Sequence, residues 1–113
     1  MIDIEELKPQ IIERLMPLKP DKIILFGSYA YGTPNEESDI DLYVVTNDNL
    51  IPQSFQENFN IKIKYLKALN DFTDKYATDI IIHTRQMHAK FLKLNSSFSR
   101  KINNDGKVLY EEY

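Results

Sequence analysis

The chain has 113 residues and a net charge of −3, with 14 Lys and Arg residues against 17 Asp and Glu residues. A chain of this length can bury one sizeable core, so we predict a single domain over residues 1–113. The slight acidic excess argues against nucleic-acid binding by bulk electrostatics. The lack of cysteine excludes disulfides, zinc–thiolate sites and thiol catalysis. No stretch reaches the roughly 20 apolar residues of a membrane span, so we expect a cytoplasmic protein with no membrane partner.

The chain begins with a predicted helix and strand. Apolar residues recur every three or four positions over residues 4–16, which is typical of an amphipathic helix. Asp3 can cap its start, and Pro9 either kinks the helix or marks a later beginning. A continuous apolar run over residues 23–26 follows, as expected for a strand that is buried on both faces. Gly27-Ser28 ends this strand.

A polar loop leads to a second predicted strand over residues 40–45. Apolar residues alternate there with Asp39, Asp41 and Tyr43, so one face of the strand is apolar and the other carries carboxylates. This pattern predicts a strand with one buried face.

A long amphipathic helix is predicted over residues 55–76. Its apolar stripe consists of Phe55, Phe59, Ile63, Leu66, Leu69, Phe72 and Tyr76. Ile61 and Tyr65 lie off this stripe and are either exposed or widen it. Because the helix forms a crossover connection, the strands before and after it are either parallel neighbours or separated by another strand.

The last part of the chain is predicted to hold two strands and two helices. A strand over residues 77–83 carries Asp79 near its start, and a helix over residues 85–94 follows it. A second helix over residues 95–104 and a short strand over residues 107–110 complete the order. The elements predict an α/β or α+β domain with a small mixed sheet and helices packed against it.

The Gly27-Ser28 turn has the properties of a phosphate site. Glycine lets the backbone bend sharply and approach a ligand closely. A helix that follows would present N–H groups and a dipole that favour an anion, and Ser28 adds a hydroxyl donor. Taken alone, the pair is more often a plain turn between a strand and a helix.

Three aspartates are a stronger indication of chemistry. Asp39 and Asp41 point to the same side of a strand, where aspartate is otherwise disfavoured, and Asp79 starts a strand that can lie beside it. On an exposed strand face the carboxylates would only be solvated. Alternatively, they converge on Mg²⁺, which prefers oxygen ligands. Asp39 and Asp41 would then bridge two metal ions, and Asp79 would hold the ion that activates an attacking hydroxyl or accept its proton.

Gly27-Ser28, followed after residues 29–38 by Asp39-Ile40-Asp41, resembles the motif of the nucleotidyltransferase superfamily related to DNA polymerase β. Within that superfamily the chain looks like the minimal nucleotidyltransferases of the MntA type. The resemblance implies a palm-like core, a small mixed sheet with helices on one side. It also implies that Gly27 and Ser28 bind the triphosphate of ATP, and that Asp39, Asp41 and Asp79 bind Mg²⁺.

The resemblance further implies an activity and a partner. MntA-type proteins commonly serve as antitoxins beside an all-helical HEPN ribonuclease, in toxin–antitoxin pairs of a type VII-like kind. The implied reaction is Mg²⁺-dependent transfer of AMP from ATP to a tyrosine of that toxin. Two alternatives remain: an antitoxin that binds nucleotide and acts by contact without catalysis, and an adenylyltransferase for small molecules similar to those that modify aminoglycosides.

The chain also departs from its relatives. Tyr29 and Tyr31 stand where many relatives have arginine, so positive charge for the triphosphate must come from metal, from a partner or from distant basic residues. Lys22, Arg85 and Arg100 are the candidates. The long predicted helix is generous for a minimal member of the family, and its outer face is a candidate surface for a partner.

Two histidines are not assigned to the site. His83 shares a strand face with Asp79, but we expect it to bond to backbone or water at the strand end. His88 is expected on a helix surface. Tyr43 either covers the metal site or belongs to ordinary sheet packing.

Overall fold

Four strands form one mixed sheet in the computed structural model, which describes residues 3–112. In space their order is β3-β2-β1-β4. The strands are β1 (Lys22–Phe26), β2 (Ile40–Val45), β3 (Thr78–His83) and β4 (Lys107–Glu111). β1 is antiparallel to both β2 and β4, whereas β2 and β3 are parallel neighbours. The mixed sheet is confirmed, and the register decides that no strand separates β2 from β3.

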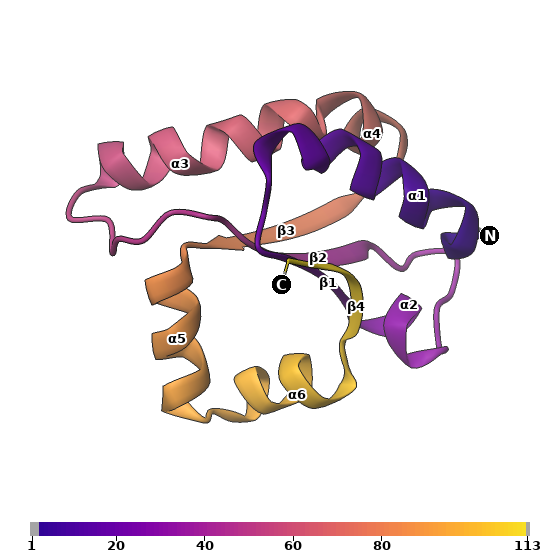
Figure 1. The fold of residues 1–113 in the computed structure, drawn as a ribbon. Coiled ribbons are helices and arrows are strands. Elements are labelled where there is room, and N and C mark those ends of the chain that lie inside the picture. Colours follow the sequence, from indigo (N-terminus) through magenta and orange to yellow (C-terminus); the bar gives the residue numbers. More distant parts are fainter. Residues whose placement is uncertain (1–2, 113) are drawn as a thin grey trace.

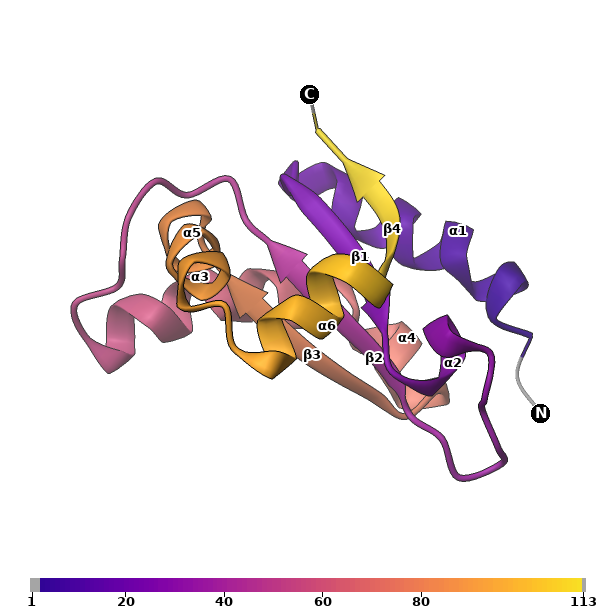
Figure 2. The same cartoon turned by 90° about the horizontal axis from the view of Figure 1, so that it is seen from below.

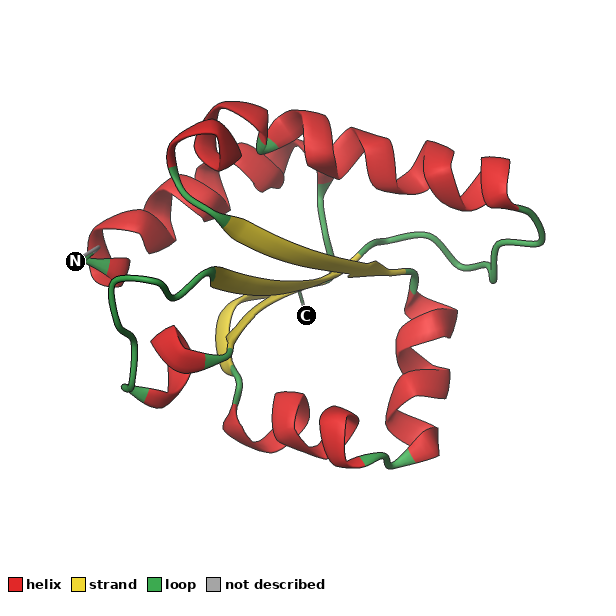
Figure 3. Cartoon of the chain, turned by 180° about the vertical axis from the view of Figure 1, so that it is seen from behind, coloured by secondary structure: helices red, strands yellow, loops and turns green. Residues whose placement is uncertain are grey.

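The sheet lies between two groups of helices (Figures 1 and 3). In chain order the helices are α1 (Ile4–Leu15), a 3₁₀ turn (Met16–Leu18), α2 (Ser28–Tyr31), α3 (Phe55–Ala68), α4 (Asn70–Lys75), α5 (Arg85–Leu94) and α6 (Ser97–Asp105). The first group, α1, α3 and α4, buries its apolar side chains against one face of the sheet. α5 and α6 pack against the other face. The mixed α/β class is confirmed, but α5 and α6 depart from the expectation of helices on one side.

Both faces of the central strands are apolar, which explains why both are covered. Leu42 and Val44 of β2 join the core under α1, α3 and α4. Tyr43 and Val45, which alternate with them, pack with Ile102 of α6 on the other face. A strand with apolar residues at successive positions needs a cover on each side to remove them from water.

The predicted helix over residues 55–76 is two helices. α3 ends at Ala68 and α4 begins at Asn70, with Leu69 as the cap between them, and neither Gly nor Pro marks the break in the sequence. The buried face consists of Ile61, Tyr65, Leu69 and Phe72. Two residues assigned off the apolar stripe therefore belong to the core and widen it.

The other half of the predicted stripe is exposed. Phe55, Phe59 and Leu66, which we name the α3 stripe, are 82%, 43% and 41% exposed. The rings of the two phenylalanines stack on each other with centroids 6.3 Å apart. The prediction that these three residues face the core is wrong, because the helix turns Ile61 and Tyr65 toward the sheet instead.

The helix starts follow the predicted capping. The backbone N–H of Glu5 donates to Oδ1 of Asp3 at 3.0 Å, and α1 runs from Ile4 through Pro9, so the alternative of a later start is wrong. Thr84 caps α5 by accepting from the backbone N–H of Met87. No helix within residues 3–112 combines the length and apolar character that crossing a membrane requires.

Candidate functional site

Asp41 stands in a row across three strands. In the sheet register it pairs with Phe26 of β1 on one side and with Asp79 of β3 on the other. Asp39 lies just before the first residue of β2 and is exposed. The ends where β2 and β3 begin lie near α2, seen from below in Figure 2. The structure thus brings the three predicted aspartates to one end of the sheet.

The side chain of Asp41 lies against the Gly27-Ser28 turn. A methyl group on Gly27 would sit 2.0 Å from Oδ2 of Asp41, so any other residue here would displace this carboxylate from its position. Gly27 also has φ 74° and ψ −162°, a conformation that other residues rarely adopt. The two halves of the sequence motif are therefore in contact: Gly27, which follows β1, lies against the carboxylate of Asp41 in β2.

Electrostatic repulsion is built into this row. Burial raises the pKa of Asp41, and the negative charges of Asp79 and Asp39 raise it further. Carboxylates that disfavour one another's ionisation are typical of sites that bind cations or move protons. A divalent cation would relieve this repulsion.

The carboxylates fit Mg²⁺ in chemistry but do not enclose it by themselves. Among residues 3–112, no three His, Asp or Glu side chains are arranged so that they could hold one metal ion. Mg²⁺ usually takes one or two carboxylates and completes its shell with phosphate oxygens and water. The row of aspartates is suited to that mode, and the predicted magnesium site stays a prediction.

Two of the basic residues expected to reach the triphosphate lie at the wrong end of the sheet. Lys22 begins β1, at the end opposite to Gly27, and its Nζ lies 3.4 Å from a carboxylate oxygen of Glu111. Arg85 follows the far end of β3 and forms a two-pronged ion pair with Asp21. The prediction for these two residues is wrong, because strand direction carries them away from the turn.

The charge beside the turn comes from α6. Arg100, the third candidate, donates a hydrogen bond from its guanidinium to the carbonyl of Asn95. Its neighbour Lys101 instead places Nζ 5.0 Å from the centre of the Tyr31 ring, which belongs to α2. The sequence pattern holds no sign of this contact, because α6 and α2 meet only in the tertiary fold.

Tyr43 is part of the packing between the sheet and α5. It is fully buried, stacks on Phe91, and its hydroxyl lies 2.9 Å from Nδ1 of His83 and 2.8 Å from Nδ1 of His88. A hydroxyl has one proton, so with both imidazoles neutral one ring accepts it and the other donates. The expectations of a surface His88, and of a His83 bonded to backbone or water, are wrong.

Burial shifts the pKa of all three side chains of this Tyr43 cluster (Tyr43, His83 and His88). It raises the pKa of the Tyr43 hydroxyl and lowers the pKa of both imidazoles. Each shift favours the neutral form, which is the form that the shared hydrogen bonds need. The cluster therefore joins β2, β3 and α5 as a structural element.

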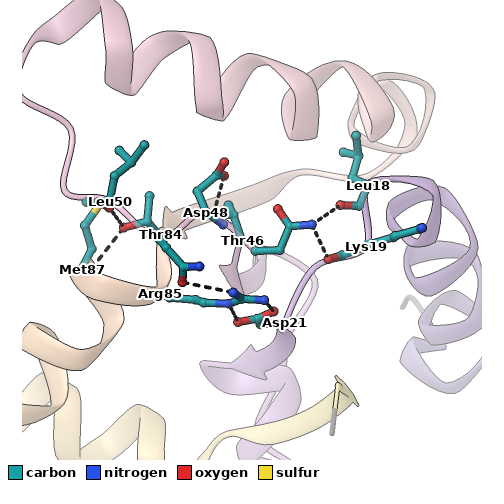
Figure 4. A network of polar contacts seen from close by, with 11 residues as sticks. Leu18, Lys19, Asp21, Thr46, Asp48, Leu50, Thr84, Arg85 and Met87 are labelled. Atoms are coloured by element: carbon teal, nitrogen blue, oxygen red, sulfur yellow. Dashed lines mark hydrogen bonds and ion pairs between the residues drawn. The ribbon is translucent and has the colours of Figure 1, made fainter.

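The opposite end of the sheet holds a network of polar contacts, shown in Figure 4. Arg85 bonds Asp21 and, at 3.0 Å, Oδ1 of Asn49. The hydroxyl of Thr84 donates to the carbonyl of Leu50 at 2.6 Å. These contacts fix the loop between β2 and α3 to the starts of β1 and α5. A hollow of about 470 Å³ beside them is lined by Asp21, Lys22, Val45, Arg85, His88, Glu111 and Glu112.

The fold and the site together define a nucleotidyltransferase core of the polymerase β kind, in which a Gly-Ser turn meets an aspartate on the next strand. A sequence model described as "Polymerase beta, Nucleotidyltransferase" matches residues 9–113, and the chain belongs to this family of nucleotide-transferring enzymes.

Individual relatives support the same class. Two proteins of Methanocaldococcus jannaschii carry the name "Putative protein adenylyltransferase". MJ0604 is 36% identical over 89 residues, which cover 79% of this chain and 77% of its own length. MJ0141 is 32% identical over 103 residues, 91% of each chain.

Solved structures show a similar fold. A chain in the crystal structure of a toxin–antitoxin with AMP-PNP is 26% identical, with a TM-score of 0.55 over 93% of this chain and 73% of the other. A chain of a mutant toxin–antitoxin MntA-HpeT is 23% identical, with a TM-score of 0.51 over the same shares, and supports the fold alone. These structures confirm the resemblance to the MntA type at the level of the fold.

Proposed function

We propose that the protein transfers AMP from ATP to a hydroxyl group of a partner protein, as the antitoxin of a toxin–antitoxin pair. The partner is a HEPN toxin, and the acceptor is one of its tyrosines. The observation that carries the proposal is the carboxylate of Asp41, held against Gly27 and paired in register with Asp79. The relatives named as adenylyltransferases and the structural neighbour with AMP-PNP support ATP as the donor. Because the reaction consumes ATP, the proposal keeps the predicted cytoplasmic location.

The proposed reaction assigns a role to each site residue. The acceptor oxygen attacks the α-phosphorus of ATP and forms a new P–O bond. The bond from that phosphorus to the oxygen that bridges to the β-phosphorus breaks, and pyrophosphate leaves. Gly27 and Ser28 bind the triphosphate, and Asp79 either accepts the hydroxyl proton or holds the ion that activates the hydroxyl. Asp39, Asp41 and Asp79 would hold Mg²⁺, which supplies neutralisation of phosphate charge when bound.

The α3 stripe is the proposed docking surface for the toxin. Phe55, Phe59 and Leu66 expose apolar area along one side of a helix, a feature that commonly marks a protein contact. In helical spacing, Lys62 lies beside this stripe, three residues after Phe59 and four before Leu66. The surface therefore fits an apolar helix face with an acidic border on the partner. Two copies of this chain would bring lysines together, which disfavours a homodimer through the same face.

The test is to incubate the protein with its HEPN partner, ATP and Mg²⁺ and to measure the intact mass of the partner. We expect a gain of one or more AMP units with the wild-type chain and none with the double substitution Asp39→Asn, Asp41→Asn. An unchanged mass at saturating ATP would contradict the proposal. Phe59→Glu should abolish modification of the partner without weakening ATP binding. The control Gln56→Glu, on the same helix, should leave modification of the partner intact.

The two alternatives give different outcomes in the same experiment. If the protein acts by contact alone, the double aspartate variant will still suppress toxicity in cells and the partner mass will not change. If the acceptor is a small molecule, pyrophosphate will be released with that molecule present and the toxin absent. Suppression that requires the aspartates and the partner together would support the proposed reaction over both.

A further inference from the structure

The turn that is proposed to hold the triphosphate has no charged residue of its own. α2 runs over Ser28–Tyr31 and carries neither acidic nor basic side chains. Of its two tyrosines, Tyr29 is 7% exposed and packs in the core with α1, so it cannot contact a ligand. A triphosphate that binds here next to three carboxylates needs cations. A basic side chain of α6 contacts the helix that follows this turn.

α6 lies across β1 (Figure 2). It packs on the face that Tyr43 shares with Asp41 by strand alternation. Ile102 is buried against Ile24, and the ring of Phe98 meets the edge of the Phe26 ring at 5.8 Å. Phe26 is the residue paired with Asp41 in the sheet. These contacts fix α6 as a wall of the site.

Lys101 extends from this wall to the turn. Its Nζ lies 5.0 Å from the centre of the Tyr31 ring, in the range of a cation–π contact. None of the ion pairs found within residues 3–112 uses Lys101. Lys22 and Arg85, by contrast, are engaged with Glu111 and Asp21 at the other end of the sheet. The ammonium group of Lys101 therefore lies over the ring of Tyr31, the last residue of the helix that begins at Ser28, and no ion pair found within residues 3–112 neutralises it.

We propose that Lys101, positioned over Tyr31, is the cationic contact for the β- and γ-phosphates of the nucleotide. The inference rests on the proposed function and adds to it a specific residue outside the family motif. The ring of Tyr31 limits the freedom of the long lysine side chain, so less entropy is lost when the ammonium group binds an anion. Tyr29 is then buried within the core, whereas Tyr31, which packs against the core and is only partly buried, supports a lysine.

The test is to measure the affinities of the full chain for ATP and for AMP by calorimetry with Mg²⁺ present. Lys101→Met should weaken ATP binding about 10-fold, the size expected for one charge-assisted contact, and should leave AMP binding within about 2-fold. Lys101→Arg should restore ATP binding to within about 3-fold. Tyr31→Leu, which removes the ring and keeps the lysine, should weaken ATP binding by a smaller factor. The control is Lys93→Met, an exposed lysine in the last turn of α5, which should change neither affinity.

The outcomes separate this inference from the function on which it rests. If the wild-type chain binds ATP and Lys101→Met binds it equally well, the inference alone is overturned. Equal weakening of ATP and AMP would also overturn it, because the lysine would then act on the nucleoside or the fold. If the wild-type chain binds no ATP, both the inference and the proposed function fail. Thermal melting of each variant checks that an exposed substitution has left the fold intact.

Discussion

The two ends of the sheet differ in how their charged side chains are arranged. At the end where β1 and β4 pair through Lys22 and Glu111, opposite charges lie together, with Arg85 on Asp21. At the end where β1 reaches Gly27, Asp39, Asp41 and Asp79 lie together, and within residues 3–112 no ion pair neutralises them. The two groups lie at opposite ends of the same sheet.

This difference separates a structural end from a functional one. Opposite charges that pair neutralise one another and contribute a little to stability. They therefore attract a charged ligand only weakly. Like charges held together destabilise the folded chain unless a cation or proton joins them. The aspartate end therefore lowers the stability of the fold and favours the binding of a cation. Substitutions there should mainly change activity, whereas substitutions at the other end should mainly change stability.

The largest expected effect distinguishes the ends by activity. Asp41→Asn should lower the rate of AMP transfer by roughly 100- to 1,000-fold, because a metal-holding carboxylate supplies several kcal/mol of transition-state stabilisation. Asp21→Asn, at the other end, should leave the rate within about 3-fold of wild type. Initial rates of pyrophosphate release check both. Equal losses for the two variants would abolish the distinction.

The next effect concerns the two glycines with positive φ. Gly27→Ala should destabilise the fold by about 3 kcal/mol or more, because it adds backbone strain and a methyl group that collides with Asp41. Gly32→Ala has a similar φ of 79° but no atom within 4 Å of the added methyl, so it should cost only about 1 kcal/mol. Urea unfolding measures both.

A third variant isolates the collision. Combining Gly27→Ala with Asp41→Ala should recover part of the loss, which a double-mutant cycle reports as a coupling energy. Zero coupling would show that Asp41 and Gly27 are not in contact in solution.

A smaller effect is expected from pH at the Tyr43 cluster. Burial holds the pKa of His83 and His88 below their ordinary 6.5, and Lys62 and Lys22 respectively lower these pKa values further. The unfolded chain therefore takes up protons first. The stability contribution is complete above pH 6.5 and is lost as the pH falls through the lower, folded-state pKa values.

The measurement is the free energy of unfolding between pH 7.5 and about 5.5, above the range in which ordinary carboxylates titrate. The double substitution His83→Gln, His88→Gln should flatten the loss of stability with falling pH. A slope equal to that of the wild type would assign the pH dependence to other groups.

The smallest effect is expected at the end of the sheet that carries the ion pair between Arg85 and Asp21. A double-mutant cycle with Asp21→Asn and Arg85→Gln should give a small coupling energy, since the Arg85 side chain is 42% exposed and solvent screens the pair. The matched pair is Arg14 and Asp71, whose 2.9 Å contact involves a carboxylate that is 69% exposed and should give less. High salt should reduce both, and a coupling of several kcal/mol would indicate a stronger role for this end.

Much of the site followed from short stretches of sequence. Alternation placed Asp39 and Asp41 at the start of a strand, and the Ile-rich run behind Asp79 required a second strand that a crossover could bring alongside. Such patterns act over a few residues, through strand geometry and turn chemistry. The assignment of Mg²⁺ and ATP to these residues stays a prediction, as does the single domain over residues 1–113.

The tertiary structure decided the rest, because it depended on which surfaces meet. Helical spacing in α3 allowed two apolar faces. In the packed structure the face with Ile61 and Tyr65 is buried against the sheet, and the α3 stripe is exposed. The same packing put α5 and α6 on the second face of the sheet, which brought the half-buried His88 against Tyr43. It also carried Lys101 to a turn that lies some 70 residues earlier in the chain. Contacts between elements so far apart are fixed by the shape of the whole core, and no local pattern in the sequence encodes them.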